Sequence, residues 1–597
     1  MTQSPNSSAH TFHIPVMGTG FTIDTPLRVA RYGISSVISL VDDILIEQMR
    51  KFHCEKAGEP YDEIADTDED ARARRITAYL NLLDRLVKKQ VGELRAAPFD
   101  AGSDITRYFE MLPESPLKNE YHAMLETSDP VERARREQDL RRRATPGDID
   151  VNIMTKLDCD RINNGGKMPP EYSDAKSALR GFASSTLRSS IVFSAGMNRG
   201  LFKYCNSFDD FYPDDDGGPR KKIVLKVSDY RSAEFQGKFL AKRGLWVSEL
   251  RIESGLNCGG HAFPTKGMLL GPIMDEFRTK RAGLEERLFA LYVDALRNLD
   301  RAVPGMPYNI RLTVQGGIGT AVENEMLFKY YNIDSTGWGT PFLLVPEAVN
   351  MDEKHLEKIA AARDGEVYLS DSSPLGIPFW NLRTSASEEA RRQRIHNGRP
   401  GSACRKGYLR FDTELTDKPV CRASAAYQKL RLEHLENEPL NMLQHEAIKE
   451  DILSKSCICN DLAGVATVSN GIDPDATPAI CCGPNIVNFS KTVSLHEMID
   501  HIYSRISLMV NPERPHMFVR ELMIYIDYFR DEVEKSSLGL TNRNQQYLRE
   551  FKENLMSGIE NYLNVAEKYI EERKERFIND IQALKLELEG IELAVTV

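Results

Sequence analysis

Short apolar runs, each bounded by Gly, Pro, Asp or Asn, recur along the first 340 residues of the chain. Runs of this length that are closed by turn-forming residues predict β-strands, and segments with helical spacing of apolar residues separate most of them. Eight strands are predicted, at residues 13–17, 34–41, 149–154, 190–195, 222–228, 245–252, 308–315 and 332–336.

Helices are expected between these strands and after the last one. A strand followed by a helix, repeated eight times, predicts an α/β fold in which a parallel sheet closes into a (β/α)8 TIM barrel. The predicted helices cover residues 25–31, 173–186, 232–243, 267–299, 321–331 and 352–363.

About a hundred residues separate the second strand from the third, and more than two hundred follow the barrel. We therefore expect a barrel domain at 1–385 with a helical insertion at about 43–147, in which 67–95 and 131–143 are helical. Glu137 and Asp139 interleave with arginines in the second of these helices, so a solvated face is favoured over an anionic partner.

Beyond the barrel the pattern changes twice. Residues 386–490 are rich in Cys, Asn, Pro and Gly and predict an irregular segment, whereas 491–597 predicts helices. These helices cover 495–510, 517–534 and 542–593, with Gly558 as the expected position of any break. The apolar spacing of the last helix suits packing along the barrel or a homo-oligomer contact with a second copy, and both remain open.

Composition narrows the class of protein. With 41% hydrophobic residues, 28% charged residues and a net charge of −11, the 597-residue chain is typical of globular proteins and argues against a nucleic-acid partner. Met1 to His13 lacks the apolar core of a signal peptide, and no uninterrupted apolar run reaches membrane-spanning length. We expect a cytoplasmic protein without a membrane partner, whose ten cysteines are thiols or metal ligands.

Glycine-bearing loops follow the last three predicted strands, at 255–261, 315–320 and 337–340. Active sites of parallel barrels form at this rim, and a phosphate site commonly follows strands seven and eight. Gly316 and Gly317 offer N–H groups beside the start of the helix at Ala321, and Gly339 and Thr340 complete a phosphate cradle. Tight turns that require positive φ are the alternative explanation for either loop alone.

His261 follows strand six, on the same rim, behind Gly259 and Gly260, which bring the backbone close to a ligand. An imidazole can take a proton from a carbon acid near neutral pH. We therefore interpret His261 as a catalytic acid or base.

These loops resemble those of the nitronate monooxygenase (2-nitropropane dioxygenase-like) family of FMN-dependent TIM barrels. The resemblance covers about residues 13–385. It is carried by Pro15-Val-Met-Gly18, by the histidine loop at 255–261, by Gly316-Gly-Ile318 and by Gly339-Thr-Pro-Phe342, with Asn152 on the third strand. Where the family has Glu-Ala, this chain has Asn257-Cys258.

The resemblance implies a flavoprotein oxidoreductase or monooxygenase. His261 would take a proton from a small-molecule carbon acid and electrons would pass to FMN. It also implies a flavin-dependent enoyl reductase as an alternative, and a non-catalytic phosphate-binding barrel or assembly scaffold is the second alternative. The residues implied to contact FMN are Met17, Gly18, Asn152, Gly259, Gly260, Gly316, Gly317, Gly339 and Thr340.

Lys226, near the end of the fifth strand, is a further candidate from its position alone. It could point into the barrel mouth and stabilise negative charge on a reduced flavin, or form a salt bridge at the rim. Cys258 invites a nucleophilic role near a flavin, although a small buried cysteine is the more common outcome.

Two other patterns suggest metal. Six cysteines crowd between residues 404 and 482, and Cys404, Cys421, Cys457 and Cys459 could hold zinc or an iron–sulfur cluster. No C-x2-C spacing supports this, so buried thiols are the alternative. His496 and His501 lie five residues apart and would diverge on a helix, which argues against a zinc-protease motif; Ser494 and Glu497 predict a helix cap instead.

Overall fold

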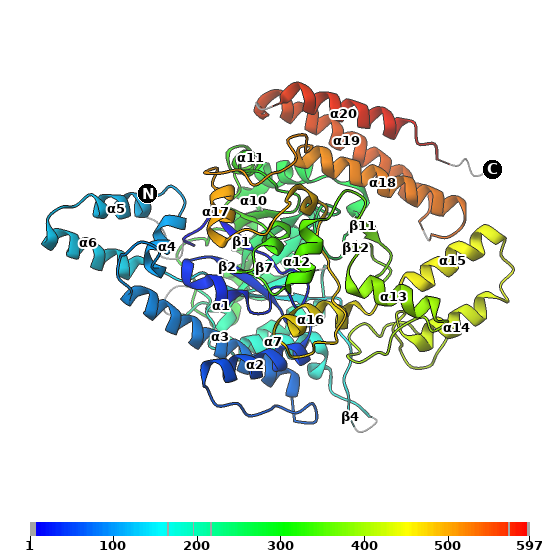
Figure 1. Ribbon diagram of the computed structural model, residues 1–597, viewed down its shortest axis with the longest axis horizontal. Helices are drawn as coiled ribbons and strands as arrows, with labels where there is room; N and C mark the ends of the chain where they lie inside the picture. The colour runs from blue at the N-terminus through cyan, green and yellow to red at the C-terminus, as the bar shows by residue number, and fades with distance from the viewer. Residues whose placement is uncertain are drawn as a thin grey trace.

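The computed structural model describes residues 8–163, 166–194, 196–214, 218–541, 543–570 and 573–593. Eight parallel strands close into a barrel in the order β1-β10-β9-β8-β7-β6-β3-β2, which confirms the predicted fold (Figure 1). Each predicted strand is present. Their bounds are β1 Phe12–Ile14, β2 Ser35–Ser39, β3 Ile149–Met154, β6 Ser190–Ser194, β7 Lys222–Val227, β8 Val247–Glu253, β9 Arg311–Gln315 and β10 Ser335–Gly337.

The helices that follow these strands form the outer layer of the barrel. Their bounds are α1 Thr25–Val29, α3 Ala71–Ala96, α7 Asp174–Ala183, α8 Arg199–Tyr204, α9 Tyr230–Ala241, α10 Leu270–Asn298, α11 Ala321–Tyr331 and α12 Glu353–Ala360. In Figure 1 they surround the strands, so the apolar faces that gave the helical spacing pack toward the sheet.

The insertion between β2 and β3 is partly a component of the barrel. Helix α3 packs against both α1 and α7, so it supplies the outer helix of the second β/α unit. The remaining helices are α2 Asp43–Ala57, α4 Asp104–Met111, α5 Pro116–Leu125 and α6 Pro130–Arg143. Helices α5 and α6 project at one side of the molecule (Figure 1), and the predicted charge pairing is present: Arg133 and Glu137 form an i,i+4 ion pair at 3.2 Å.

Side chains fill the centre of the barrel. Val37, Val192 and Val224 pack together there, and deeper in the barrel Arg251 and Glu249 form a buried ion pair at 2.7 Å. Because this core is closed, a ligand can enter only at a rim, as is usual for barrels of eight strands.

The prediction of an irregular segment at 386–490 is wrong in part. Four helices occur there, and two antiparallel strands precede them: β11 Val367–Ser370, β12 Phe379–Leu382, α13 Ala386–His396, α14 Ala425–Leu435, α15 Met442–Ser454 and α16 Ile458–Ser469. Ser385, Ser424 and Asn441 cap three of these helices with their side chains. The helices are short and their starts depend on caps, so a search for long apolar periodicity missed them.

The C-terminal helices are α17 Leu495–Ile502, α18 Met517–Ser537, α19 Gln545–Tyr569 and α20 Lys574–Glu589. They lie along one side of the barrel (Figure 1), where α19 packs against α10 and α18. The apolar face of α19 is thus covered within the chain, while a homo-oligomer stays a prediction. The expected start of this helix at Asn542 lies outside the described residues, as do Ala195 and Met1–Ser7.

The chain breaks after Tyr569 and not at Gly558. Gly558 lies inside α19, where a Cβ would come within 2.6 Å of Leu269 Cδ1. This glycine therefore allows a close approach of helix and barrel. In the part of the chain that the structure describes, no helix combines the length and the apolar character needed to cross a membrane.

Candidate active site

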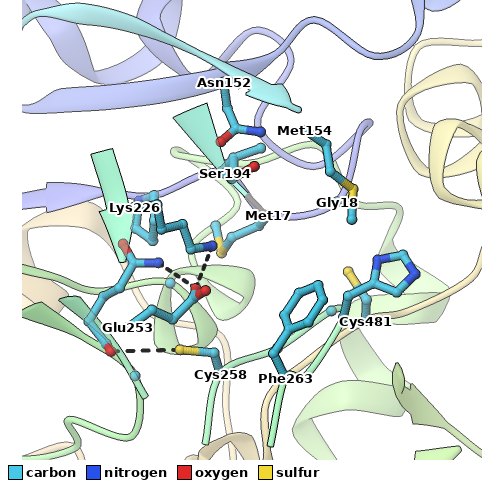
Figure 2. A pocket seen from close by; sticks show the side chains of 18 of the residues that line it. Met17, Gly18, Asn152, Met154, Ser194, Lys226, Glu253, Cys258, Phe263 and Cys481 are labelled. Atoms are coloured by element: carbon cyan, nitrogen blue, oxygen red, sulfur yellow. Dashed lines mark hydrogen bonds and ion pairs between the residues drawn. The ribbon is translucent and has the colours of Figure 1, made fainter. Parts of the chain in front are cut away.

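A cavity of about 400 Å³ opens among the carboxyl ends of the barrel strands. Its volume lies in the range of small-molecule and cofactor sites. Figure 2 shows Met17, Asn152, Lys226 and Glu253 around it. All the residues predicted for catalysis and FMN contact line this one cavity: Met17, Gly18, Asn152, Lys226, Gly259, Gly260, His261, Gly316, Gly317, Gly339 and Thr340.

The loop after β9 has the backbone shape that only glycine adopts without strain. Gly316 and Gly317 have φ values of +110° and +76°, and a Cβ on Gly317 would lie 2.0 Å from Asn257 Nδ2. Positive φ and a cradle are therefore both present. Among the described residues, no acceptor binds the backbone N–H groups of Gly317, Ile318, Gly339 and Thr340. These four donors fit the phosphate group that the sequence predicts.

The helix that follows does not offer its own N-terminus to a ligand. Helix α11 begins at Ala321 as predicted, but Thr320 and Glu323 form a capping box. The Glu323 carboxylate accepts from the N–H groups of Gly319 and Thr320 at 2.8 and 3.2 Å. We therefore correct the expectation that the positive end of this helix faces the phosphate: the free donors belong to the loops.

His261 lies in the cavity wall with its ring partly exposed. Its Nε2 lies 2.8 Å from Ser373 Oγ, and its ring packs edge-on against Phe379. Burial, and after it the nearby positive charge of Lys226, lowers the pKa of His261 to about 4. The imidazole is therefore neutral at physiological pH and can accept a proton.

Lys226 reaches the cavity from β7 and forms the salt bridge that the sequence left as an alternative. Its Nζ lies 2.6 Å from Glu253 Oε1, and the Gln315 amide donates to the same oxygen at 2.7 Å (Figure 2). Both predicted features, the position in the mouth and the ion pair, are present. The pair places a cation and an anion, held together, in the wall of the cavity.

Cys258 follows the second interpretation given above for a thiol at this position. Its Sγ donates to Gln315 O at 3.7 Å, and burial raises its pKa well above the usual value. A protonated thiol is a weak nucleophile. Cys258 instead packs closely on the glycine loop, because a Cβ on Gly316 would lie 2.4 Å from its Sγ.

Asn152 and the loop after β1 complete the barrel side of the cavity. The buried Oδ1 of Asn152 has no hydrogen-bond partner among the described residues. An unpaired buried amide oxygen is costly unless a ligand donor meets it, and FMN carries such donors. Met17 lies close to Gly339, and Gly18, with φ of +53°, packs on Phe21 and Cys481.

The outer wall of the cavity comes from beyond the barrel, which the sequence did not indicate. These residues are separated from the motifs by a hundred positions or more and carry no local signature. Ser373 contacts His261 directly, and the others that line the cavity are Phe379, Tyr408, Leu409, Ile458, Cys459, Leu462, Cys481 and Asn485.

The structure does not support the metal prediction for Cys404, Cys421, Cys457 and Cys459. Within the described ranges, no three His, Cys, Asp or Glu side chains are grouped as metal ligands. Cys404 is exposed while the other three are buried, so the four do not share one environment. Burial raises the pKa of Cys421 to about 12, which leaves it a thiol. Buried thiols, the alternative given above, describe these residues.

The rejected zinc motif contains a residue that matters for another reason. Ser494 and Glu497 form the predicted capping box of α17. His501, on the same helix, is buried, accepts from Leu508 N through Nδ1 and donates from Nε2 to Gly319 O at 2.9 Å. The C-terminal region thus contacts the glycine loop after β9.

No protein-family model matches the sequence, and no curated protein matches it. Two solved structures are similar. The enoyl reductase domain of MlnA from the macrolactin biosynthesis cluster of Bacillus amyloliquefaciens has 12% identity and a TM-score of 0.31, over 68% of this chain and 89% of that one. Nitroalkane oxidase from Streptomyces ansochromogenes has 11% identity and a TM-score of 0.30, over 63% and 84% respectively. At this level of similarity, function is inferred from the cavity itself.

Proposed function

We propose that this protein is an FMN-dependent oxidoreductase of the nitronate monooxygenase type. The supporting observation is that a neutral imidazole and two glycine loops with free N–H groups line the same cavity. A catalytic base and an anion cradle in one site match the chemistry that the sequence motifs imply. The substrate is a small carbon acid.

The residues that would hold FMN divide by chemistry. The N–H groups of Gly317, Ile318, Gly339 and Thr340 suit the phosphate, and Asn152 suits a ring donor. When bound, FMN supplies an acceptor for the two electrons left on carbon once a proton has been removed.

His261 removes that proton. Because Ser373 Oγ accepts from Leu375 N at 3.2 Å, a His261 tautomer that donates from Nε2 to Ser373 leaves Nδ1 as the free base. Ser373 therefore acts as a positioning residue. The Lys226–Glu253 pair holds a positive charge near the place where negative charge develops on substrate and cofactor.

An apolar outer wall keeps water from this proton transfer. Phe263, Phe379, Leu409 and Leu462 line the cavity, and apolar side chains in a closed site strengthen the electrostatic contribution of Lys226. This wall also favours a substrate with an apolar substituent of modest size.

Flavin absorbance tests the proposal. The purified protein, or the protein reconstituted with FMN, should absorb near the flavin maxima. His261→Ala should keep the flavin and lose substrate-driven bleaching under anaerobic conditions. A protein that takes up no FMN would refute the proposal. Bleaching by NADPH with turnover of an enoyl thioester, and none by nitronates, would assign the enoyl-reductase alternative.

A further inference from the structure

The C-terminal region holds the glycine loop after β9 through three consecutive carbonyl groups. Arg514 donates from Nη2 to Gly317 O at 2.8 Å, and Asn485 donates from Nδ2 to Ile318 O at 3.1 Å. His501 makes the third contact, to Gly319 O at 2.9 Å. Every carbonyl of this short loop is thus fixed by a side chain from outside the barrel.

Fixing a carbonyl group also directs the next N–H group. The C=O of one residue and the N–H of the next point in opposite directions across a planar trans peptide. Since the Gly317 carbonyl points at Arg514, the Ile318 N–H points away from Arg514, and Ile318 lines the cavity. Arg514 therefore holds one free donor of the cradle in a position to meet a ligand.

A buried carboxylate lies beside this cradle. Glu323 is 3% exposed, and besides the loop N–H groups it accepts from Met517 N at 2.7 Å. An uncompensated carboxylate at this place would repel a phosphate group through a medium of low dielectric constant. Arg514 Nη1 donates to Glu323 Oε1 at 2.5 Å, and the Arg514 side chain is 8% exposed.

Charge pairing keeps Glu323 ionised in spite of burial. Burial alone would raise the pKa of Glu323, but the Arg514 charge holds it below the usual value. Removing the guanidinium would therefore leave an unpaired buried charge next to the loop. Asn485 accepts from Arg514 Nε at 2.9 Å, so the guanidinium is also fixed in place.

We propose that Arg514 is a positioning residue for the phosphate group of FMN, because it orients the Gly317–Gly319 loop and neutralises Glu323 beside it. This inference rests on the proposed function. It assigns to the C-terminal region a part in cofactor binding that the barrel motifs alone do not supply.

Comparison of FMN with riboflavin, which lacks the phosphate, isolates this effect. Dissociation constants are measured by quenching of flavin fluorescence for the full chain and its variants. Arg514→Met should weaken FMN binding at least about tenfold, as expected for an unpaired buried charge, and change riboflavin binding much less. Arg514→Met combined with Glu323→Gln should recover most of the FMN affinity, since Gln keeps the capping box.

The matched control is Arg520→Met. Arg520 lies in the same region and forms a surface ion pair with Asp364 at 3.4 Å, so FMN affinity should not change. Glu323→Gln alone provides a test that does not depend on the folding of Arg514→Met: it should tighten FMN binding and leave riboflavin binding unchanged.

The outcomes separate the two proposals. A wild-type chain that binds neither FMN nor riboflavin refutes the proposed function itself. Wild-type FMN binding with an equal loss of FMN and riboflavin affinity in Arg514→Met overturns only the role of Arg514, as does unchanged or weaker FMN binding in Glu323→Gln. Circular dichroism confirms that the compared variants are folded.

Discussion

Acidification should destabilise this protein through His261 before it abolishes the base. Burial and the Lys226 charge lower the pKa of His261 from 6.5 to about 4 in the folded protein. In the unfolded chain the imidazole has its ordinary pKa near 6.5. Between these values the unfolded state binds the proton and the folded state does not, so stability is present above pH 6.5 and is lost as the pH falls toward 4.

The magnitude follows from this shift. At pH 5 the unfolded imidazole is almost fully protonated, whereas the folded one is about nine-tenths neutral, which corresponds to a loss of about 2 kcal/mol relative to pH 7. His261→Asn removes the titrating group. The free energy of unfolding of this variant should therefore fall by about 2 kcal/mol less than that of the wild type over the same interval.

Chemical denaturation at pH 7 and pH 5, for wild type and variant in parallel, measures this difference. The Cε1–H resonance of His261, assigned by its loss in His261→Asn, gives the pKa directly. His10 and His516 also have pKa values lowered to about 4 by burial, but they titrate equally in both chains and cancel. A His261 resonance that titrates near 6.5, or an equal loss of stability in both proteins, would refute this account of the base.

Two further predictions concern the loops. Ser373→Ala should lower the rate of substrate-driven flavin reduction roughly tenfold at unchanged FMN affinity, because the tautomer of His261 is no longer fixed; Ser373→Thr should retain the rate, and a loss of flavin from Ser373→Ala would contradict a positioning role. Gly317→Ala should abolish FMN binding and destabilise the fold by about 1–3 kcal/mol, whereas Gly365→Ala, at a φ of +87° in open space, should retain the flavin.

The strands and the barrel half of the site could be predicted because their signals are local. A strand such as Ile149–Met154 is a short apolar run between turn residues, and a βα loop follows its strand directly. Once the strands were in order, topology brought His261, Gly316 and Gly339 to one rim without any knowledge of tertiary contacts.

The remaining half of the site depends on contacts that no local pattern contains. Ser373 lies 112 residues from its partner His261, and Arg514 lies 197 residues from Gly317. A serine in a loop and an arginine before a helix are common in any sequence. Their partners become known only when the chain beyond the barrel folds back over the mouth. The helices at 386–490 were missed for a related reason, since caps and tertiary packing rather than long periodicity define them.

Asn257 shows how the barrel motif and the C-terminal region depend on each other. Its Nδ2 donates to Met517 O at 3.4 Å and lies directly against Gly317, while Met517 N donates to Glu323. A glutamate at this position, as in the family pattern, could not donate to the Met517 carbonyl, and its charge would approach that of Glu323. The amide removes both conflicts. The departure of this chain from the family motif is therefore the change that a C-terminal region docked on the glycine loop requires.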